Sequence, residues 1–205
     1  MTSGGWFSFV SYNFALMKFL QQAFLACLSL LLSVYSFAQT SLPEADKSPL
    51  DVSYYPLNYP LLKIQNKATE APLARVIYSR PKREGRPIFG NLVEYGKLWR
   101  LGANEATELE FYKPVTIGGR KVPKGRYTLY AIVKEKFWTI IINKETDIWG
   151  SFKYNQAKDL ARIEVPVETL GETAEMLCMT FEKTKENFSL IIAWENTKVA
   201  VPIQP

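Results

Sequence analysis

The residues best suited to chemistry lie in one stretch, 75–108, which is dense in arginine, lysine and glycine and reads RVIYSRPKREGRPIFGNLVEYGKLWRLGANEATE. Planar guanidinium groups bind carboxylates through two parallel hydrogen bonds, either inside a protein or on a ligand. Glycines at short intervals let the backbone adopt turns that other residues avoid. The stretch therefore predicts a polar site on a turn-rich segment, and it does not specify a reaction.

Within this stretch, Arg100 and Glu105 are expected to meet across a turn at residues 102–103. Five residues that include a glycine can fold back and bring a long arginine and a glutamate together, with Asn104 orienting the backbone. A buried, satisfied pair would fix the shape of the loop, whereas a pair at an open pocket would hold a ligand. The predicted ligand-binding set is Arg80, Trp99, Arg100, Asn104 and Glu105, and the secondary candidates are Arg86, Trp149 and Tyr154.

Several kinds of catalysis are excluded by composition. The chain contains no histidine, which removes Ser-His-Asp and Cys-His catalysis and histidine-ligated metals. Glycine motifs for nucleotide phosphates are also absent. Carboxylate acid–base chemistry, calcium held by oxygens, and binding without catalysis remain. We expect no cofactor and no resident metal. If the protein is an enzyme, Glu105 is the catalytic candidate, with Glu94, Glu108 and Glu110 as the other nearby acids.

The N-terminal region has the order of a secretory signal peptide. Met17 and Lys18 precede a long apolar run, and small residues at Ser36 and Ala38 suit a signal peptidase. We predict a signal peptide over 1–38 with an over-long start, cleaved after Ala38, and translation could begin at Met1 or Met17. A retained membrane anchor is the alternative, because the run is long enough to span a bilayer.

The remaining chain is expected to form a polar tether, 39–50, and one domain, 51–205. Its location is expected to be the periplasm or the cell surface, with membrane contact only through the signal peptide before cleavage. Cleavage leaves Cys178 as the one cysteine, so the domain must be stable without an internal disulfide. The net charge is +5, but the signs are mixed along the chain and export argues against nucleic acid as a partner.

Short apolar runs separated by turn residues predict an all-β fold, a single antiparallel β-sandwich of jelly-roll-like or meander type with an irregular N-terminal extension. Prolines argue against regular helix in 51–62, and 144–160 is expected to be a loop with at most one helical turn. Later strands are expected at 161–167, 175–182, 188–194 and 198–203, with a polar connection at 169–175. The predicted core comprises Val76, Tyr78, Ile117, Leu129, Tyr130, Ile132, Trp138, Ile140, Ile142, Ile163, Val165, Phe181, Leu190, Ile192 and Trp194.

The stretch at 75–108, together with VTIGGRKVPKGRYTLYAI at 115–132 and the later WTIIINK and WGSFKY, resembles DUF family 2911. The most specific part is Trp99-Arg100 followed by residues 102–107. Leu101 departs from the family pattern, which usually has a small polar residue there, and Lys124 and Arg126 replace smaller residues. The resemblance implies an exported bacterial protein with a β-rich fold, and it brings no known activity.

These observations favour a non-catalytic ligand-binding or envelope-associated domain. The alternative is a carboxylate-dependent hydrolase that acts on glycans. In both cases the expected partner is a small molecule or a glycan.

Overall fold

The computed structural model describes residues 16–28 and 42–205. Residues 16–28 form a helix, and the strands belong to a compact unit, Ala45–Pro205. Among the described residues, no helix is long and apolar enough to cross a membrane. The predicted cleavage site after Ala38 lies outside the described residues. The compact unit begins at Ala45, so the last residues of the predicted tether belong to it.

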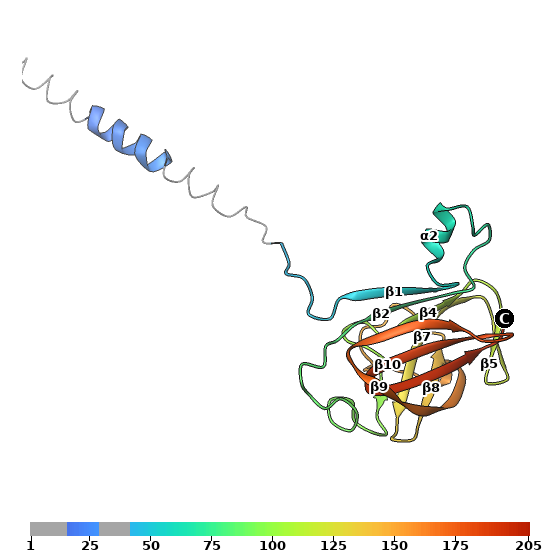
Figure 1. Cartoon of the computed structure of the whole chain (residues 1–205). Helices are drawn as coiled ribbons and strands as arrows, with labels where there is room; N and C mark the ends of the chain where they lie inside the picture. Colours follow the sequence, from blue (N-terminus) through green and yellow to red (C-terminus); the bar gives the residue numbers. More distant parts are fainter. Residues whose placement is uncertain (1–15, 29–41) are drawn as a thin grey trace, which may run out of the picture. The chain divides into compact units, whose positions relative to one another are not determined.

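An antiparallel sheet accounts for most of the compact unit, in the spatial order β1-β2-β4-β7-β8-β9-β10, with β3 paired to β7. A separate hairpin joins β5 to β6. In Figure 1 the orange and red strands β9 and β10 lie across the rest of the curled sheet. The all-β, antiparallel prediction is confirmed, with sandwich-like packing around one core. The strands are β1 Leu50–Tyr55, β2 Ala74–Ser79, β3 Leu98–Trp99, β4 Glu108–Phe111, β5 Val115–Ile117, β6 Arg120–Val122, β7 Gly125–Val133, β8 Phe137–Asn143, β9 Asp159–Lys183 and β10 Phe188–Ile203.

Strands β7 and β8 are buried on both faces. Along β8, Trp138, Ile140 and Ile142 pack in the main core, whereas Ile141 on the other face is buried in a small second cluster with Tyr130 and Ala106. Each large apolar side chain buried in this way contributes about 1.5–3 kcal/mol. Of the predicted core residues, Ile132 and Ile163 are only half-buried, and the others are buried.

The last two strands are longer than predicted. β9 runs for 25 residues without a break, pairing first with β8 and then with β10. The predicted connection at 169–175 is therefore wrong. Its polar residues continue the strand because Thr169 and Ala174 pair with β10, and two register shifts around Glu195 absorb the irregularity.

The sheet curls until the chain after β2 meets β9. Lys82 pairs with Met176, and the Leu177 N–H donates to the Pro81 carbonyl at 3.1 Å. We call this contact between residues 78–82 and β9 the seam. Side chains also contribute to it, because the Tyr78 hydroxyl donates to the Met179 carbonyl at 3.2 Å and Arg80 Nε donates to the Leu177 carbonyl at 3.1 Å.

The prediction that 51–62 holds no regular helix is wrong in its second half. The first half is extended as β1, but the helix α2 spans Tyr59–Ile64. Pro60 is tolerated because it lies in the first turn of α2, where a backbone N–H has no partner within the helix.

Candidate functional site

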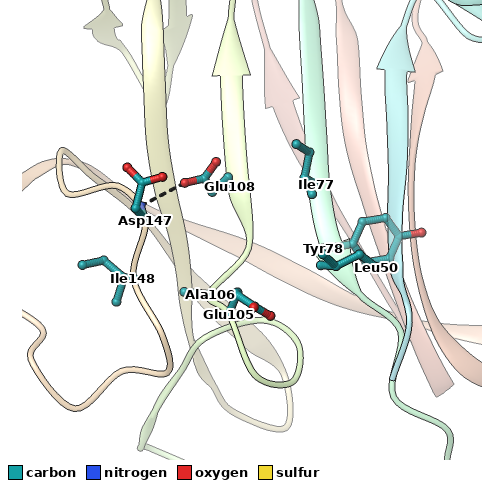
Figure 2. A pocket seen from close by; sticks show the side chains of 8 residues that line it. All are labelled: Leu50, Ile77, Tyr78, Glu105, Ala106, Glu108, Asp147 and Ile148. Carbon is teal, nitrogen blue, oxygen red and sulfur yellow. Dashed lines mark hydrogen bonds between the residues drawn. The ribbon is translucent and has the colours of Figure 1, made fainter. Parts of the chain in front are cut away.

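A cavity opens where β2 and β4 stop pairing. Their ladder ends at Ile77 and Glu108, and the chain approaches β2 again at Gly102. A side-chain carbon on Gly102 would lie 3.3 Å from the Ser79 carbonyl oxygen, so this close approach suits glycine. Between these two points lies a first cavity of about 210 Å³. Figure 2 shows its lining, which is Leu50, Ile77, Tyr78, Glu105, Ala106, Glu108, Asp147 and Ile148.

The loop that borders this cavity is shaped by its own hydrogen bonds. Thr107 Oγ1 donates to the Leu101 carbonyl at 2.6 Å, and the Thr107 N–H donates to the Arg100 carbonyl at 3.1 Å. Trp99 Nε1 donates to the Gly102 carbonyl at 3.3 Å. Leu101 is fully buried and has a φ of 55°, a strained value for a residue with a large side chain. The loop therefore has one well-defined shape.

Residues 104–106 pair with residues 148–150 of the loop that follows β8. The Gly150 N–H donates to the Asn104 carbonyl and the Ala106 N–H donates to the Ile148 carbonyl, both at 2.9 Å. Glu105 is thus placed directly opposite Trp149. A second cavity of about 490 Å³ adjoins the first through Leu50 and Glu105, which line both. Its lining is Asp46, Ser48, Pro49, Leu50, Asn104, Glu105 and Trp149. We call the two cavities and the rings of Trp149 and Phe152 the Glu105–Trp149 site.

An exposed pair of aromatic rings borders the second cavity. Trp149 and Phe152 are 63% and 82% exposed, and their rings stack with centroids 5.9 Å apart and planes inclined by 18°. Gly150 has a φ of 73°, and a side-chain carbon there would lie 2.6 Å from the Phe152 ring. A glycine between the two aromatic residues therefore allows the Phe152 ring to fold back toward Trp149.

The loop that carries Trp149 is held to the sheet by Asn143. This side chain is fully buried at the end of β8. Its amide nitrogen donates to the Asn155 carbonyl at 3.0 Å and to Asp159 Oδ1 at 2.8 Å. Its oxygen accepts from the Glu145 N–H at 2.9 Å. Asn143 thus joins both ends of the loop.

The polar lining of the site is acidic. Arg126 donates to both carboxylate oxygens of Asp147 at 2.7 Å and lies 3.4 Å from Glu108 Oε1. The hydrogen bonds from Arg126 hold the pKa of Asp147 below its usual value. Within the part of the chain that the structure describes, Glu105 forms no ion pair, and no lysine or arginine lines either cavity.

The predicted meeting of Arg100 and Glu105 is wrong. Across the described residues, no ion pair or side-chain hydrogen bond joins them, and Arg100 Nε is buried without a hydrogen-bond partner. Burial lowers the pKa of Arg100. The physical reason is that Thr107 and backbone groups close the turn, and the pairing of 104–106 with 148–150 directs Glu105 to Trp149.

Two other residues of the predicted ligand-binding set are structural. Arg80 belongs to the seam, where Nη1 donates to Asp51 Oδ2 at 3.0 Å. Trp99 is 7% exposed and packs in the aromatic core against Phe89, Trp138 and Trp194. Neither lines a cavity of the Glu105–Trp149 site.

Of the secondary candidates, only Trp149 lies at the site. Arg86 donates to the carbonyls of Lys82 and Arg83 and so stabilises its own loop. Tyr154 packs edge-on against Tyr130, and its hydroxyl donates to Asp159 at 2.5 Å. The structure therefore brings Asn104, Glu105 and Trp149 together, and it places the other predicted residues elsewhere.

Sequence reasoning missed Asp147, Ile148 and Asn143, because the segment NKETDI has the composition of any polar turn. It also left the role of Phe152 open, although the Trp-Gly-Ser-Phe order at 149–152 indicates that two rings can fold together. In the two described ranges, no group of three or more acidic, cysteine or histidine residues is arranged to hold a metal ion.

Comparison with known proteins adds no activity. No curated protein and no solved structure matches the chain. The family described as "Protein of unknown function (DUF2911)" matches residues 60–203, a range that includes Asn104, Glu105 and Trp149. The chain therefore belongs to the DUF2911 family.

Proposed function

We propose that this protein is an exported, non-catalytic binding domain whose ligand is a glycan or sugar-like molecule held at the Glu105–Trp149 site. The observation that carries the proposal is the position of Glu105 directly opposite the exposed Trp149, where two cavities adjoin. Ligand sites are typically concave and largely apolar, with a few polar groups that fix orientation.

The side chains at the site match the two chemical faces of a sugar. The C–H face of a pyranose is apolar and packs on an aromatic ring, which Trp149 and Phe152 offer with most of their surface exposed. Sugar hydroxyls donate hydrogen bonds, and the carboxylates of Glu105 and Glu108 accept them. Ile77 and Ile148 supply apolar walls.

The contacts of Glu108 and Asp147, the other two carboxylates that line the first cavity, favour binding without catalysis. A glycosidase needs one protonated carboxyl as general acid and a second carboxylate as base or nucleophile. Arg126 engages both Asp147 and Glu108, and the lowered pKa of Asp147 favours an ionised acceptor over a proton donor. The hydrolase alternative rests on Glu105, which shares the first cavity with Glu108.

Export is part of the proposal. It is supported by the order of charge, apolar run and small residues in 17–38, and by a compact unit that begins at Ala45, beyond the expected cleavage after Ala38. The test is the intact mass of the protein recovered from the periplasm and the medium. A full-length chain found only in the membrane fraction would refute export.

The binding test is a titration of the mature protein against neutral and charged oligosaccharides from cell walls and plant material. We expect Trp149→Ala to abolish detectable binding, while Tyr95→Ala, which removes another exposed aromatic residue, leaves it unchanged. Equal affinity of wild type and Trp149→Ala would refute the site. Turnover of a glycan that Glu105→Gln abolishes would instead establish the hydrolase alternative.

A further inference from the structure

We propose that the ligand of the Glu105–Trp149 site carries a positively charged amino group, as in a sugar with a free amine. This inference rests on the proposed function and narrows its ligand class. The two cavities and the exposed aromatic rings form the site, and the negative charge of the cavity lining favours a positively charged ligand.

The charge of the lining is opposite to that of the chain. The protein has a net charge of +5, yet the charged side chains that line the two cavities are Asp46, Glu105, Glu108 and Asp147. Nearby cations would be needed to bind an acidic sugar, and no cation lines these cavities within the described residues. Like charges repel, so uronic acids and phosphorylated sugars are disfavoured.

The carboxylates differ in what they already bind. Arg126 forms ion pairs with Glu108 and Asp147, and Asp46 accepts a hydrogen bond from the Ser48 N–H at 2.6 Å. For Glu105, no side-chain hydrogen bond or ion pair occurs within residues 42–205. Glu105 is also the carboxylate common to both cavities, so an ammonium group bound to it can lie in either one.

The indole of Trp149 adds a second attraction for the same charge. Tryptophan is the most effective aromatic partner for an organic cation within about 6 Å of the ring. Because Trp149 pairs directly with Glu105, one ammonium group can contact the carboxylate while the sugar ring packs on the indole. The combination favours an amino sugar over its neutral counterpart.

The test uses oligomers of glucosamine and of N-acetylglucosamine of equal length, which differ only in whether the amine is free or acetylated. Titrations of the mature protein are made at pH 6 and low ionic strength, where ordinary amines are protonated and carboxylates are ionised. We expect the free-amine oligomer to bind about tenfold more tightly, the combined effect of one exposed ion pair and one cation–π contact. Added salt should reduce this preference, since it screens exposed charges.

Variants separate the amine claim from the site itself. Glu105→Gln removes the ion pair and leaves the cation–π contact, so it should reduce the preference for the free amine from about tenfold to about two- to fivefold. Trp149→Ala should abolish detectable binding of both oligomers. The control Glu164→Gln removes an exposed carboxylate on β9, outside the lining of both cavities, and should change neither. A preference for the free amine that Glu105→Gln leaves intact would overturn the assignment to Glu105.

The remaining outcomes distinguish this inference from the proposed function. Equal binding of both oligomers, still lost in Trp149→Ala, would overturn the amine claim and leave sugar binding at the site in place. Failure of both oligomers and of every neutral glycan would overturn both. Cadaverine provides an amine without a sugar. Binding of cadaverine as tight as that of the amino-sugar oligomer would support the amine claim and contradict the sugar class.

Discussion

Asn143 offers a direct test of how the binding loop is positioned. Asn143→Ala removes three hydrogen bonds from a fully buried side chain, two to backbone groups and one to the Asp159 carboxylate. Backbone bonds contribute about 1 kcal/mol each and a bond to a charged group about 2 kcal/mol. Water can replace part of the loss at Asn155, which is exposed. We therefore expect a loss of about 3 kcal/mol in the free energy of unfolding, or roughly 6–12 °C in Tm for a domain of this size.

The assay is thermal and urea unfolding of the mature protein, together with hydrogen exchange over residues 144–158. Asn143→Asp keeps the acceptor for the Glu145 N–H but places a second carboxylate beside Asp159. It should be at least as destabilising at pH 7 and should recover as the pH is lowered. Asn196→Ala is the control, because Asn196 is exposed and accepts one hydrogen bond. A loss below about 1 kcal/mol for Asn143→Ala, or unchanged exchange in the loop, would show that Asn143 does not hold the loop.

Four further predictions concern the hydroxyls of Tyr78 and Tyr130, the pH dependence of stability, the pair Arg100 and Glu105, and Gly150. Tyr78→Phe removes a hydroxyl whose one proton is shared between Asp51 Oδ2 and the Met179 carbonyl, and it should cost about 1–3 kcal/mol. Tyr130→Phe removes a buried hydroxyl without a partner and should be neutral or stabilising in urea unfolding. Burial raises the pKa of Tyr130 to about 12, so the wild type should lose stability as the pH rises from about 10 toward 12, and Tyr130→Phe should reduce that loss. The effects of Arg100→Ala and Glu105→Ala on Tm should be additive in the double variant, and a clear interaction energy would show that the two residues meet after all. Gly150→Ala should displace the Phe152 ring and reduce binding at Trp149 more than stability, whereas unchanged affinity would show that the ring pair is not needed.

Much of the fold could be predicted from the sequence, because each strand with one face on the core repeats apolar residues at every second position. Strand β4 is an example, because Leu109 and Phe111 are buried and alternate with the half-buried Glu108 and Glu110. The continuity of β9 could not be predicted in this way. Residues 169–175 have the composition of a connection, and only pairing with β10 keeps them extended. The helix α2 is not predicted because prolines argue against helix, although the position of Pro60 in the first turn permits it.

The candidate site was predicted in part. Asn104 and Glu105 were found because a glycine-containing turn with polar residues indicates a defined loop, and Trp149 because its loop interrupts the strand pattern. Their meeting depends on the antiparallel pairing of 104–106 with 148–150, which joins segments more than 40 residues apart and leaves no local pattern. The charge of Arg80 suits a ligand site, but its position at the seam makes it a partner for Asp51 and for a β9 carbonyl.

The most direct test of the binding proposal is a titration followed at the isotope-labelled tryptophan indoles of the mature protein by nuclear magnetic resonance. Trp149 is the exposed indole, whereas Trp99, Trp138 and Trp194 are at most 7% exposed. On addition of glucosamine oligomers, we expect a saturable shift of the Trp149 resonance, with the three buried indoles nearly unchanged. An unchanged Trp149 resonance at high concentrations of both oligomers and of every neutral glycan tested would contradict binding at this site.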